Sequence, residues 1–570
     1  MAKSKYTDLI CVLIILLMLV VTVLFHFGGE LGIEKVERDN SHSSLSYSAV
    51  IALSDGGNQI HGNGVYQNGS AVVIAHGGEY TVTGQLTEGQ LVVEAESGAD
   101  VHIILDGADL FCSDGAALWV KNAGNTMIEL ADGSENRLAS GAVFSAEAVS
   151  LDVEGALHSE DDLILSGTGS LTVENAYRHA VVCKDALRVD GGHYSLTAAQ
   201  HGLRGRDSVE IRDGSFVIRA DRDGIQSNND VDPLLGTVTI RGGSFDIEAG
   251  QDGIQSETAL LISGGDFRLK SGKGSAGTVY APGLLPWEGA DAALSDSAKG
   301  LKAGTDLCIS SGVFTLDCED DALHCGGSLL IEGGELSIRS GDDALHGDTS
   351  LAVTNGSLHI LEAQEGLEAP ELMISGGMVD IICGNDGLNA NGEGKASLTV
   401  SGGRLNICCQ GDGIDSNGDI LISGGEITLS AQPSNGNSPL DYAAENGGHG
   451  LIHGGSVIAC GFGGMAKGFS MDSGQCSILF HLEEVVPGGT ELVLLDDEGA
   501  ELLRYTPAQD YNAVLLSTEE LREGESYTLR AGSERCGITL SQRSSVYGRG
   551  DHGFGTVPPP PRPQKNGPTH

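Results

Sequence analysis

Acidic residues recur at one position of a repeated phrase in this 570-residue sequence, and each is followed by glycine or alanine. If the repeats stack on one another, neighbouring carboxylates lie about 5 Å apart, a spacing at which unneutralised like charges destabilise a fold. The position is occupied by Asp223, Asp252, Asp321, Asp343, Glu365, Asp386 and Asp412, and in other repeats by His179, His201 and Lys299.

Two ways of relieving this repulsion are open. Either solvent and backbone amides screen the charges, or Ca²⁺, a hard cation that prefers six to eight oxygen ligands, bridges adjacent repeats. The pairs Asp320–Asp321 and Asp342–Asp343, 22 residues apart, are the best candidates because each pair offers two carboxylates. The predicted metal ligands are Asp223, Asp252, Asp320, Asp321, Asp342, Asp343, Asp386 and Asp412.

A second row of polar residues follows three positions after these acids. We expect it to face outward, where hydrogen-bonding side chains in regular order could contact a long polymer or form an ordinary solvated face. His324 and His346 would be neighbours in this row, but two imidazoles without a third ligand make a poor transition-metal site. The row consists of Arg204, Gln226, Gln255, Lys302, His324, His346, Glu368, Asn389 and Asp415.

The repeats predict the fold. From residue 192 onward, paired glycines recur with a step near 22 residues, and each repeat has three short segments in which apolar and polar residues alternate. Alternation of period two is typical of strands, and three strands in 22 residues leave no room for a helix. Stacked three-stranded coils form a parallel β-helix, an all-β solenoid. Its corners need open backbone conformations, which explains the 85 glycines.

The cysteines follow the same register. Cys318, Cys383 and Cys409 each lie three residues before a corner acid, where other repeats have alanine. This pattern favours small buried thiols over a disulfide framework, although one disulfide between Cys383 and Cys409 stays open.

The domain organisation is read from changes in composition. Residues 9–27 are uncharged and long enough to span a bilayer, and lysines precede them. We predict a cytoplasmic N-terminus (1–8), a single-pass signal anchor (9–27), a stalk (28–49), the β-helix (50–465), a small β cap (471–540) and a disordered tail (541–570). The bulk of the chain is therefore expected outside the cell; secretion after signal cleavage is the alternative.

Charge narrows the range of partners. The formal net charge of −47 repels phosphate backbones, so we expect no nucleic-acid partner. Aromatic residues, on which sugars stack, are few, but Tyr280 and Trp287 lie in a long insertion at 271–299 that could contact a ligand. We expect the chain to be a monomer.

Several phrases resemble a known group of bacterial secreted or surface proteins, the carbohydrate-binding domain-containing proteins. The matching phrases are AALWVKNAGNTMIELADGSENRL (116–138), LHSEDDLILSGTGSL (157–171), DSAKGLKAG (296–304), DGIDSNGDILISGG (412–425) and SNGNSPLDY (434–442). The resemblance implies a right-handed parallel β-helix similar to that of pectate lyases, binding of a plant cell-wall polysaccharide such as cellulose or polygalacturonate, and bound Ca²⁺.

The leading functional hypothesis is a non-catalytic, membrane-anchored polysaccharide-binding protein stabilised by calcium. One alternative is a pectate-lyase-like polysaccharide lyase, which would need Ca²⁺ and an arginine or lysine base. Another is a structural surface spacer or adhesin. The residues proposed to contact carbohydrate are Gln226, Gln255, His324, His346, Asn389, Asp415, Tyr280 and Trp287.

Overall fold

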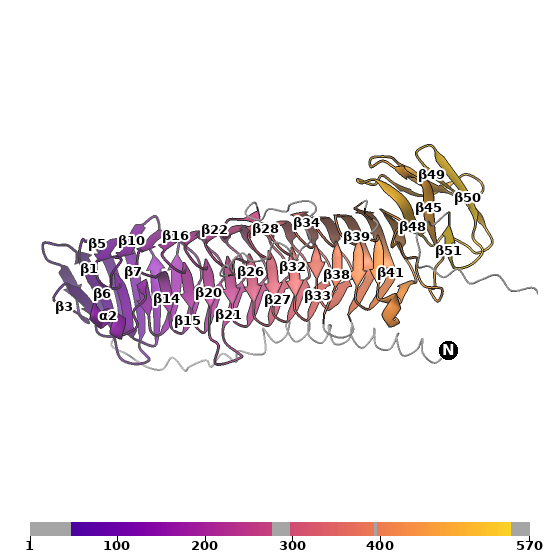
Figure 1. The fold of residues 1–570 in the computed structure, drawn as a ribbon. Coiled ribbons are helices and arrows are strands. Elements are labelled where there is room, and N and C mark those ends of the chain that lie inside the picture. Colours follow the sequence, from indigo (N-terminus) through magenta and orange to yellow (C-terminus); the bar gives the residue numbers. More distant parts are fainter. Residues whose placement is uncertain (1–46, 276–296, 393–395, 433, 435, 549–570) are drawn as a thin grey trace, which may run out of the picture. The chain divides into compact units, whose positions relative to one another are not determined.

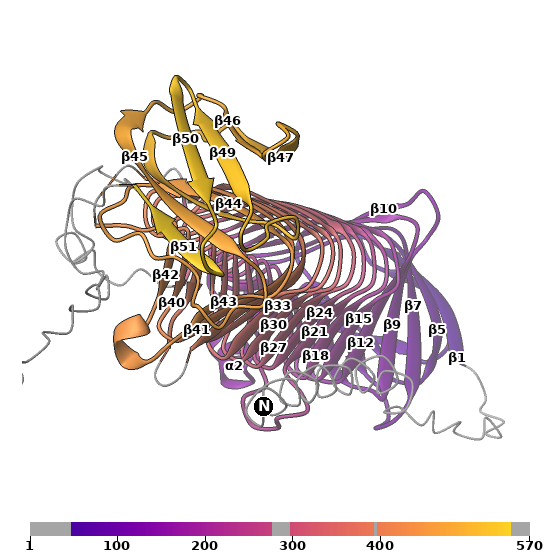
Figure 2. The same cartoon turned by 90° about the vertical axis from the view of Figure 1, so that its right-hand side faces the viewer.

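The computed structural model describes residues 47–275, 297–392, 396–432, 434 and 436–548. Within these residues the fold is all-β: long parallel sheets build a solenoid in which each coil contributes one strand to each of three faces (Figure 1). Seen from one end, the coils lie one behind another (Figure 2). Their inward side chains form one continuous apolar core.

Face 1 is a separate sheet of 16 strands among the described residues. Its strands are β3 (Val65–Asn68), β4 (Ala71–Ile74), β6 (Gln90–Glu94), β8 (Leu118–Asn122), β11 (Gly155–Ser159), β14 (His179–Cys183), β17 (Leu203–Gly205), β20 (Ile225–Ser227), β23 (Ile254–Ser256), β26 (Leu301–Ala303), β29 (Leu323–Cys325), β32 (Leu345–Gly347), β35 (Leu367–Glu368), β38 (Leu388–Ala390), β40 (Ile414–Ser416) and β42 (Leu440–Tyr442).

Faces 2 and 3 are two bent halves of a second sheet, because β7 (Asp100–Cys112), β39 (Ser397–Cys409) and β41 (Asp419–Ala431) run through both. Face 2 contains β9 (Asn125–Leu130), β12 (Asp162–Gly167), β15 (Ala186–Val189), β18 (Ser208–Ile211), β21 (Thr237–Ile240), β24 (Ala259–Ile262), β27 (Asp306–Ile309), β30 (Ser328–Ile331), β33 (Ser350–Val353), β36 (Glu371–Ile374) and β43 (Gly450–Ile452). Face 3 contains β10 (Glu135–Ser140), β13 (Ser170–Asn175), β16 (His193–Ala198), β19 (Ser215–Ala220), β22 (Ser244–Ala249), β25 (Asp266–Ser271), β28 (Val313–Cys318), β31 (Glu335–Ser340), β34 (Ser357–Glu362), β37 (Met378–Cys383) and β44 (Ser456–Gly461).

Antiparallel strands cover part of the sheet edge at both ends of the stack. At the start, β1 (Tyr47–Leu53) pairs with β2 (Gln59–Gly62) and with β5 (Gly78–Leu86). At the end, β44 pairs antiparallel with β48 (Tyr511–Ser517), which also pairs with β45 (Ser477–Val486). A further sheet contains β46 (Leu492–Leu495), β47 (Glu501–Tyr505), β49 (Ser526–Ala531) and β50 (Glu534–Thr539); the helical elements are α2 (Ala146–Ser150) and η2 (Ala444–Asn446).

Several predictions about the termini meet the structure only in part. β51 (Ser544–Tyr547) pairs with β45 inside the segment predicted to be disordered, because its serines are buried against that strand. The predicted anchor at residues 9–27 lies outside the described residues. Among the residues that are described, no helix is long and apolar enough to cross a membrane.

An internal aromatic ladder supports face 3. Stacked rings from five successive coils have centroids 4.6–5.1 Å apart and are nearly parallel. The paired glycines make room for this ladder: at Gly265, where φ is +116°, a Cβ would lie 3.0 Å from the Phe267 ring. The rings belong to Tyr194, Phe216, Phe245, Phe267 and Phe314.

The cysteines are free thiols wherever the structure describes them. Cys383 and Cys409 are paired in register on β37 and β39, and both are buried without a disulfide between them. This agrees with small side chains filling the core.

Phe245→Ala tests the ladder. Loss of this buried ring, stacked on both sides, should lower the free energy of unfolding by about 3–5 kcal/mol. Urea titration followed by circular dichroism measures the change, with the exposed Val217→Ala on β19 as control. Equal stability of the two variants would contradict a structural role for the ladder.

Candidate functional site

The corner residues form a hydrogen-bonded ladder between face 3 and face 1. The Asp223 carboxylate accepts the backbone N–H of Asp252 at 3.1 Å, one coil further along. Asp321 does the same for Asp343 at 3.1 Å, and Asp386 for Asp412 at 2.6 Å. Because these amides are turned into the corner, an acceptor there satisfies a donor that would otherwise be buried without a partner. The recurring acid is therefore first a structural acceptor.

The two histidines at corner positions provide the same acceptor. His179 Nδ1 accepts the N–H of His201 at 3.2 Å, and His201 Nδ1 accepts the N–H of Asp223 at 3.1 Å. Burial lowers the pKa of His179 well below its usual range, so this imidazole is neutral, as an accepting nitrogen requires. Lys299 has no acceptor, and the N–H of Asp321 bonds instead to Oδ1 of Asp320 at 2.9 Å.

The second oxygen of several corner acids is held by a residue of the outward row, either the one three positions later or its neighbour in the next coil. Gln226 donates to Asp223 at 2.6 Å, Lys302 lies 3.2 Å from Asp252, and His324 Nδ1 lies 2.9 Å from Asp321. The predicted polar row is thus an actual row on face 1, but much of its hydrogen-bonding capacity is used within the protein. Gln226 also donates to Gln255, and Asn389 donates to Glu365.

A lysine ammonium lies at the predicted calcium pair. Lys299 Nζ is 2.8 Å from Asp320 and 2.7 Å from Asp321, and it is mostly buried. Together with His324 it holds the pKa of Asp321 at about 2, despite burial that acts in the opposite direction. Lys299 therefore offsets part of the negative charge at this pair, and a calcium ion that bridges Asp320 and Asp321 would have to displace its ammonium group.

Further along the stack the carboxylates outnumber their cationic partners. Burial and neighbouring acids raise the pKa of Asp343 to about 7, of Asp386 to about 8 and of Asp415 to about 7. Asp412, Asp415 and Asp441 bring carboxylate oxygens within 4.8 Å of one another. Of the predicted ligands, Asp386 and Asp412 lie at this end of the stack, where burial disfavours the charged form of each carboxyl and raises its pKa.

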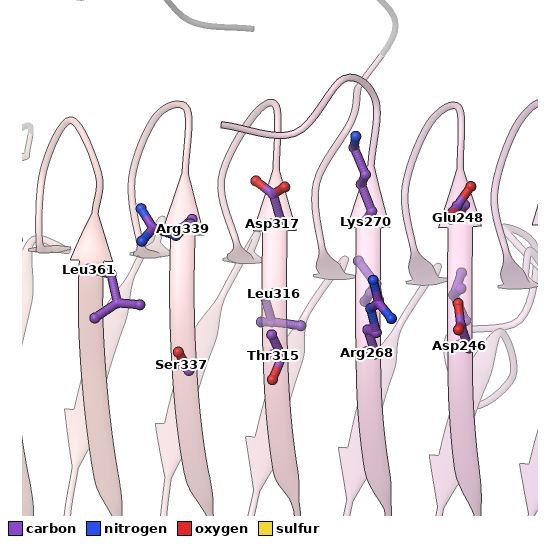
Figure 3. Close-up of a pocket in the computed structure, with 12 residues that line it drawn as sticks. Asp246, Glu248, Arg268, Lys270, Thr315, Leu316, Asp317, Ser337, Arg339 and Leu361 are labelled. Carbon is purple, nitrogen blue, oxygen red and sulfur yellow. The ribbon is translucent and has the colours of Figure 1, made fainter. Parts of the chain in front are cut away.

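A groove on face 3 was not predicted from the sequence. It has a volume of about 300 Å³ and lies across β22, β25, β28, β31 and β34. Two parallel rows of side chains stand out from these strands (Figure 3), with residues of one row paired in register from strand to strand. One row is Asp246, Arg268, Thr315 and Ser337; the other is Glu248, Lys270, Asp317 and Arg339.

Two basic side chains in the groove are unpaired within the described residues. Arg268 and Lys270 are exposed and make no hydrogen bond or ion pair with another described residue, whereas Arg339 pairs with Glu362 at 2.9 Å. Acids flank Lys270 on both sides, since Glu248 and Asp317 are its register partners, whereas Arg268 has an acid, Asp246, on one side only. In the sequence, both bases occupy outward positions of the alternating phrase DFRLKS, but this phrase has no feature that distinguishes it from the other strands of the repeat.

The insertion that contains Tyr280 and Trp287 lies outside the described residues, but its two ends are placed. Ser275 donates its N–H to Asp317 in the groove at 2.8 Å. Ser297 donates to Asp252 at the corner at 2.7 Å. The insertion therefore leaves the solenoid beside the groove and re-enters it beside the face 1 row.

Comparison with known proteins identifies similar chains. A family model described as "Carbohydrate-binding domain-containing protein" matches residues 68–344 and 342–466. A protein of that description from Acetivibrio thermocellus is 31% identical over 128 residues, which are 22% of this chain and 45% of the relative. The match thus spans less than half of that relative's length.

A solved structure is also similar in part. It is a gadolinium derivative of a polysaccharide lyase-like protein from C. thermocellum, 23% identical, with a TM-score of 0.37. The superposition covers 50% of this chain and 97% of that one. A similarity at this level carries no conclusion about what this chain binds.

The raised carboxyl pKa values predict how stability depends on pH. The folded state keeps protons on Asp343, Asp386 and Asp415 above the ordinary carboxyl pKa near 4, so it binds more protons than the unfolded chain. The free energy of unfolding should therefore fall as the pH rises from about 5 to about 9 in buffer without divalent ions. The pKa of Asp321 is lowered to about 2, so its titration changes the free energy of unfolding only below about pH 5.

Thermal denaturation across this pH range measures the effect. Asp386→Asn keeps the acceptor oxygen for Asp412 but has no titratable proton, so its Tm should vary less with pH. Asp266→Asn, an exposed acid on β25, serves as the control. A wild-type Tm that increases steadily with pH would contradict the assignment.

Proposed function

Because this chain belongs to the family of carbohydrate-binding domain-containing proteins, we propose that its solenoid binds a polysaccharide without cleaving it, in the groove on face 3. The observation that carries the proposal is the pair of exposed bases, Arg268 and Lys270, in a hollow between acids and hydroxyls. Strands in register repeat such groups at about 4.8 Å along the stack, which suits an extended polymer better than a small molecule.

The chemistry of the groove favours an acidic sugar. The guanidinium of Arg268 can bind a uronate carboxylate through two hydrogen bonds, and Lys270 adds a second positive charge. Thr315 and Ser337 offer hydroxyls for neutral sugar groups, and Asp246, which also pairs with Arg219, offers an acceptor. The net charge of −47 opposes an anionic polymer at long range, but salt screens that repulsion beyond about 8 Å at physiological ionic strength.

Lyase activity is the rival function. Arg268 or Lys270 could act as a base, but β-elimination also needs a cation on the uronate carboxylate. The groups of metal-binding side chains among the described residues do not include a groove residue. A spacer or adhesin remains a further alternative, and it predicts no saturable glycan binding.

We also propose that the solenoid acts outside the cell, held at the membrane by residues 9–27. That segment has the length and charge flanks of a signal anchor. Antiparallel strands at both ends of the stack limit edge-to-edge association, which supports a monomer.

Calcium is proposed to bind at the acidic end of face 1, at Asp412, Asp415 and Asp441. Their oxygens are close together and are the ligands that Ca²⁺ prefers. Asp441 is also paired with Lys467, so ion binding would have to rearrange that contact. The ion would supply positive charge where burial and mutual repulsion raise the carboxyl pKa values.

Polymer retention tests the main proposal. Wild-type protein should be retained on pectate more than on cellulose, and Arg268→Ala with Lys270→Ala should reduce retention about tenfold, because two charge-assisted contacts are lost. Thr239→Ala on face 2 is the control for a change on another face. Gln255→Ala tests the face 1 row predicted from the sequence.

If Gln255→Ala loses retention while the Arg268→Ala, Lys270→Ala variant is retained like the wild type, the binding surface lies on face 1. Absence of retention on both polymers, with and without Ca²⁺, would contradict binding. Ultraviolet absorbance from unsaturated product on polygalacturonate would show lyase activity instead.

The calcium proposal predicts a shift in thermal stability. EDTA should lower Tm at neutral pH and added Ca²⁺ should restore it, because an ion relieves the repulsion between the clustered carboxylates. Asp415→Asn should lose most of this response, whereas Asp348→Asn, an acid on a different coil, should keep it. Differential scanning fluorimetry measures both, and an unchanged Tm under EDTA and Ca²⁺ would refute the site.

A further inference from the structure

We infer that His324, His346 and Asp348 form a binding site for a divalent transition-metal ion such as Zn²⁺. The site lies on face 1, in the middle of the polar row, and is separate from both the polysaccharide groove and the acidic calcium cluster. It does not depend on the proposed function.

The two imidazoles are placed by adjacent strands. His324 on β29 and His346 on β32 are register partners, and their rings stack with centroids 5.1 Å apart and an interplanar angle of 26°. Each occupies the outward position between two buried residues, so the rings are partly exposed to solvent, at 21% and 25% of the side-chain area. An ion could therefore reach them.

A carboxylate orients each ring from the solenoid side. His324 Nδ1 lies 2.9 Å from Asp321, and His346 Nδ1 lies 2.7 Å from Asp343. A histidine that gives its Nδ1 proton to a carboxylate presents its Nε2 lone pair outward, which is the usual arrangement behind a metal-bound imidazole. The corner acids thus act as positioning residues.

The two outward nitrogens face the same carboxylate oxygen. Oδ1 of Asp348, in the turn after β32, is 3.8 Å from Nε2 of His324 and 3.3 Å from Nε2 of His346. Two imidazoles and one carboxylate are a common ligand set of Zn²⁺, with bond lengths of about 2.0–2.2 Å. Asp348 is half exposed, so its side chain can move to close these distances around an ion. Sequence reasoning lacked this third ligand because Asp348 lies outside the repeated positions.

The competing arrangement is a pair of imidazoles that carry protons instead of a metal. Asp343 raises the pKa of His346 to about 9, and Asp321, Asp348 and Glu368 also face these rings. A metal ion must displace the Nε2 proton, so its apparent affinity should rise as the pH increases through neutrality. Nitrogen ligands also distinguish this site from one for Ca²⁺, which prefers oxygen.

Isothermal titration with Zn²⁺ tests the inference. The full chain is stripped with EDTA, its accessible thiols are alkylated, and saturating Ca²⁺ is present throughout to fill oxygen-only sites. We expect one saturable Zn²⁺ site that is lost in His324→Gln and in His346→Gln, and weakened about tenfold or more in Asp348→Asn. Co²⁺ should give visible absorption bands of a nitrogen-ligated ion in the wild type but not in His324→Gln or His346→Gln.

A second histidine–aspartate pair provides the matched control. His359 and Asp380 on face 3 lie 3.0 Å apart and resemble the site in exposure but lack a second imidazole. His359→Gln should leave Zn²⁺ binding unchanged, and equal Tm values in all variants would show that the fold is intact. Absence of saturable binding, equal loss in His359→Gln, or full affinity in Asp348→Asn would overturn the inference.

Discussion

One constraint organises this solenoid: at most of the described corners between face 3 and face 1, a backbone N–H turns inward and bonds to a side-chain acceptor of the preceding coil. A short side chain with an acceptor atom meets that need, and aspartate does so in several coils. His179 and His201 meet it with an imidazole nitrogen. The recurring acid is thus explained by hydrogen bonding before any ligand is considered.

Meeting the constraint with carboxylates creates a second problem, since buried like charges are stacked at the strand spacing. The residues that reduce this repulsion differ along the stack. Two histidines replace the acid in early coils, Lys299 and Lys302 pair with acids in the middle, and the stacked His324 and His346 lie next to them. In the last coils the acids are left with raised pKa values. The two proposed ion sites follow from this change along the stack. The zinc site lies where imidazoles are present, and the calcium site lies where the ligands are carboxylate oxygens.

Face 3 is stabilised in a different way. On its inner side the aromatic rings of successive strands stack on one another. On its outer side some residues form ion pairs within the sheet, such as Arg219 with Asp246. Arg268 and Lys270 also occupy outward positions but keep their charges unpaired among the described residues. A rigid, flat sheet can therefore present hydrogen-bond donors at regular intervals, and recognition of a regular polymer requires such an arrangement.

The sequence by itself determined the solenoid class, the corner register and the outward row on face 1, because strand period and coil length are local properties written in each repeat. It also indicated the family through its phrases. Only the tertiary structure decided how the polar groups are used. That Lys299 neutralises Asp321, that Asp348 turns toward two imidazoles, and that Arg268 lies in a groove all depend on contacts between coils. Side-chain partners across coils are set by packing in three dimensions, so no repeat contains that information alone.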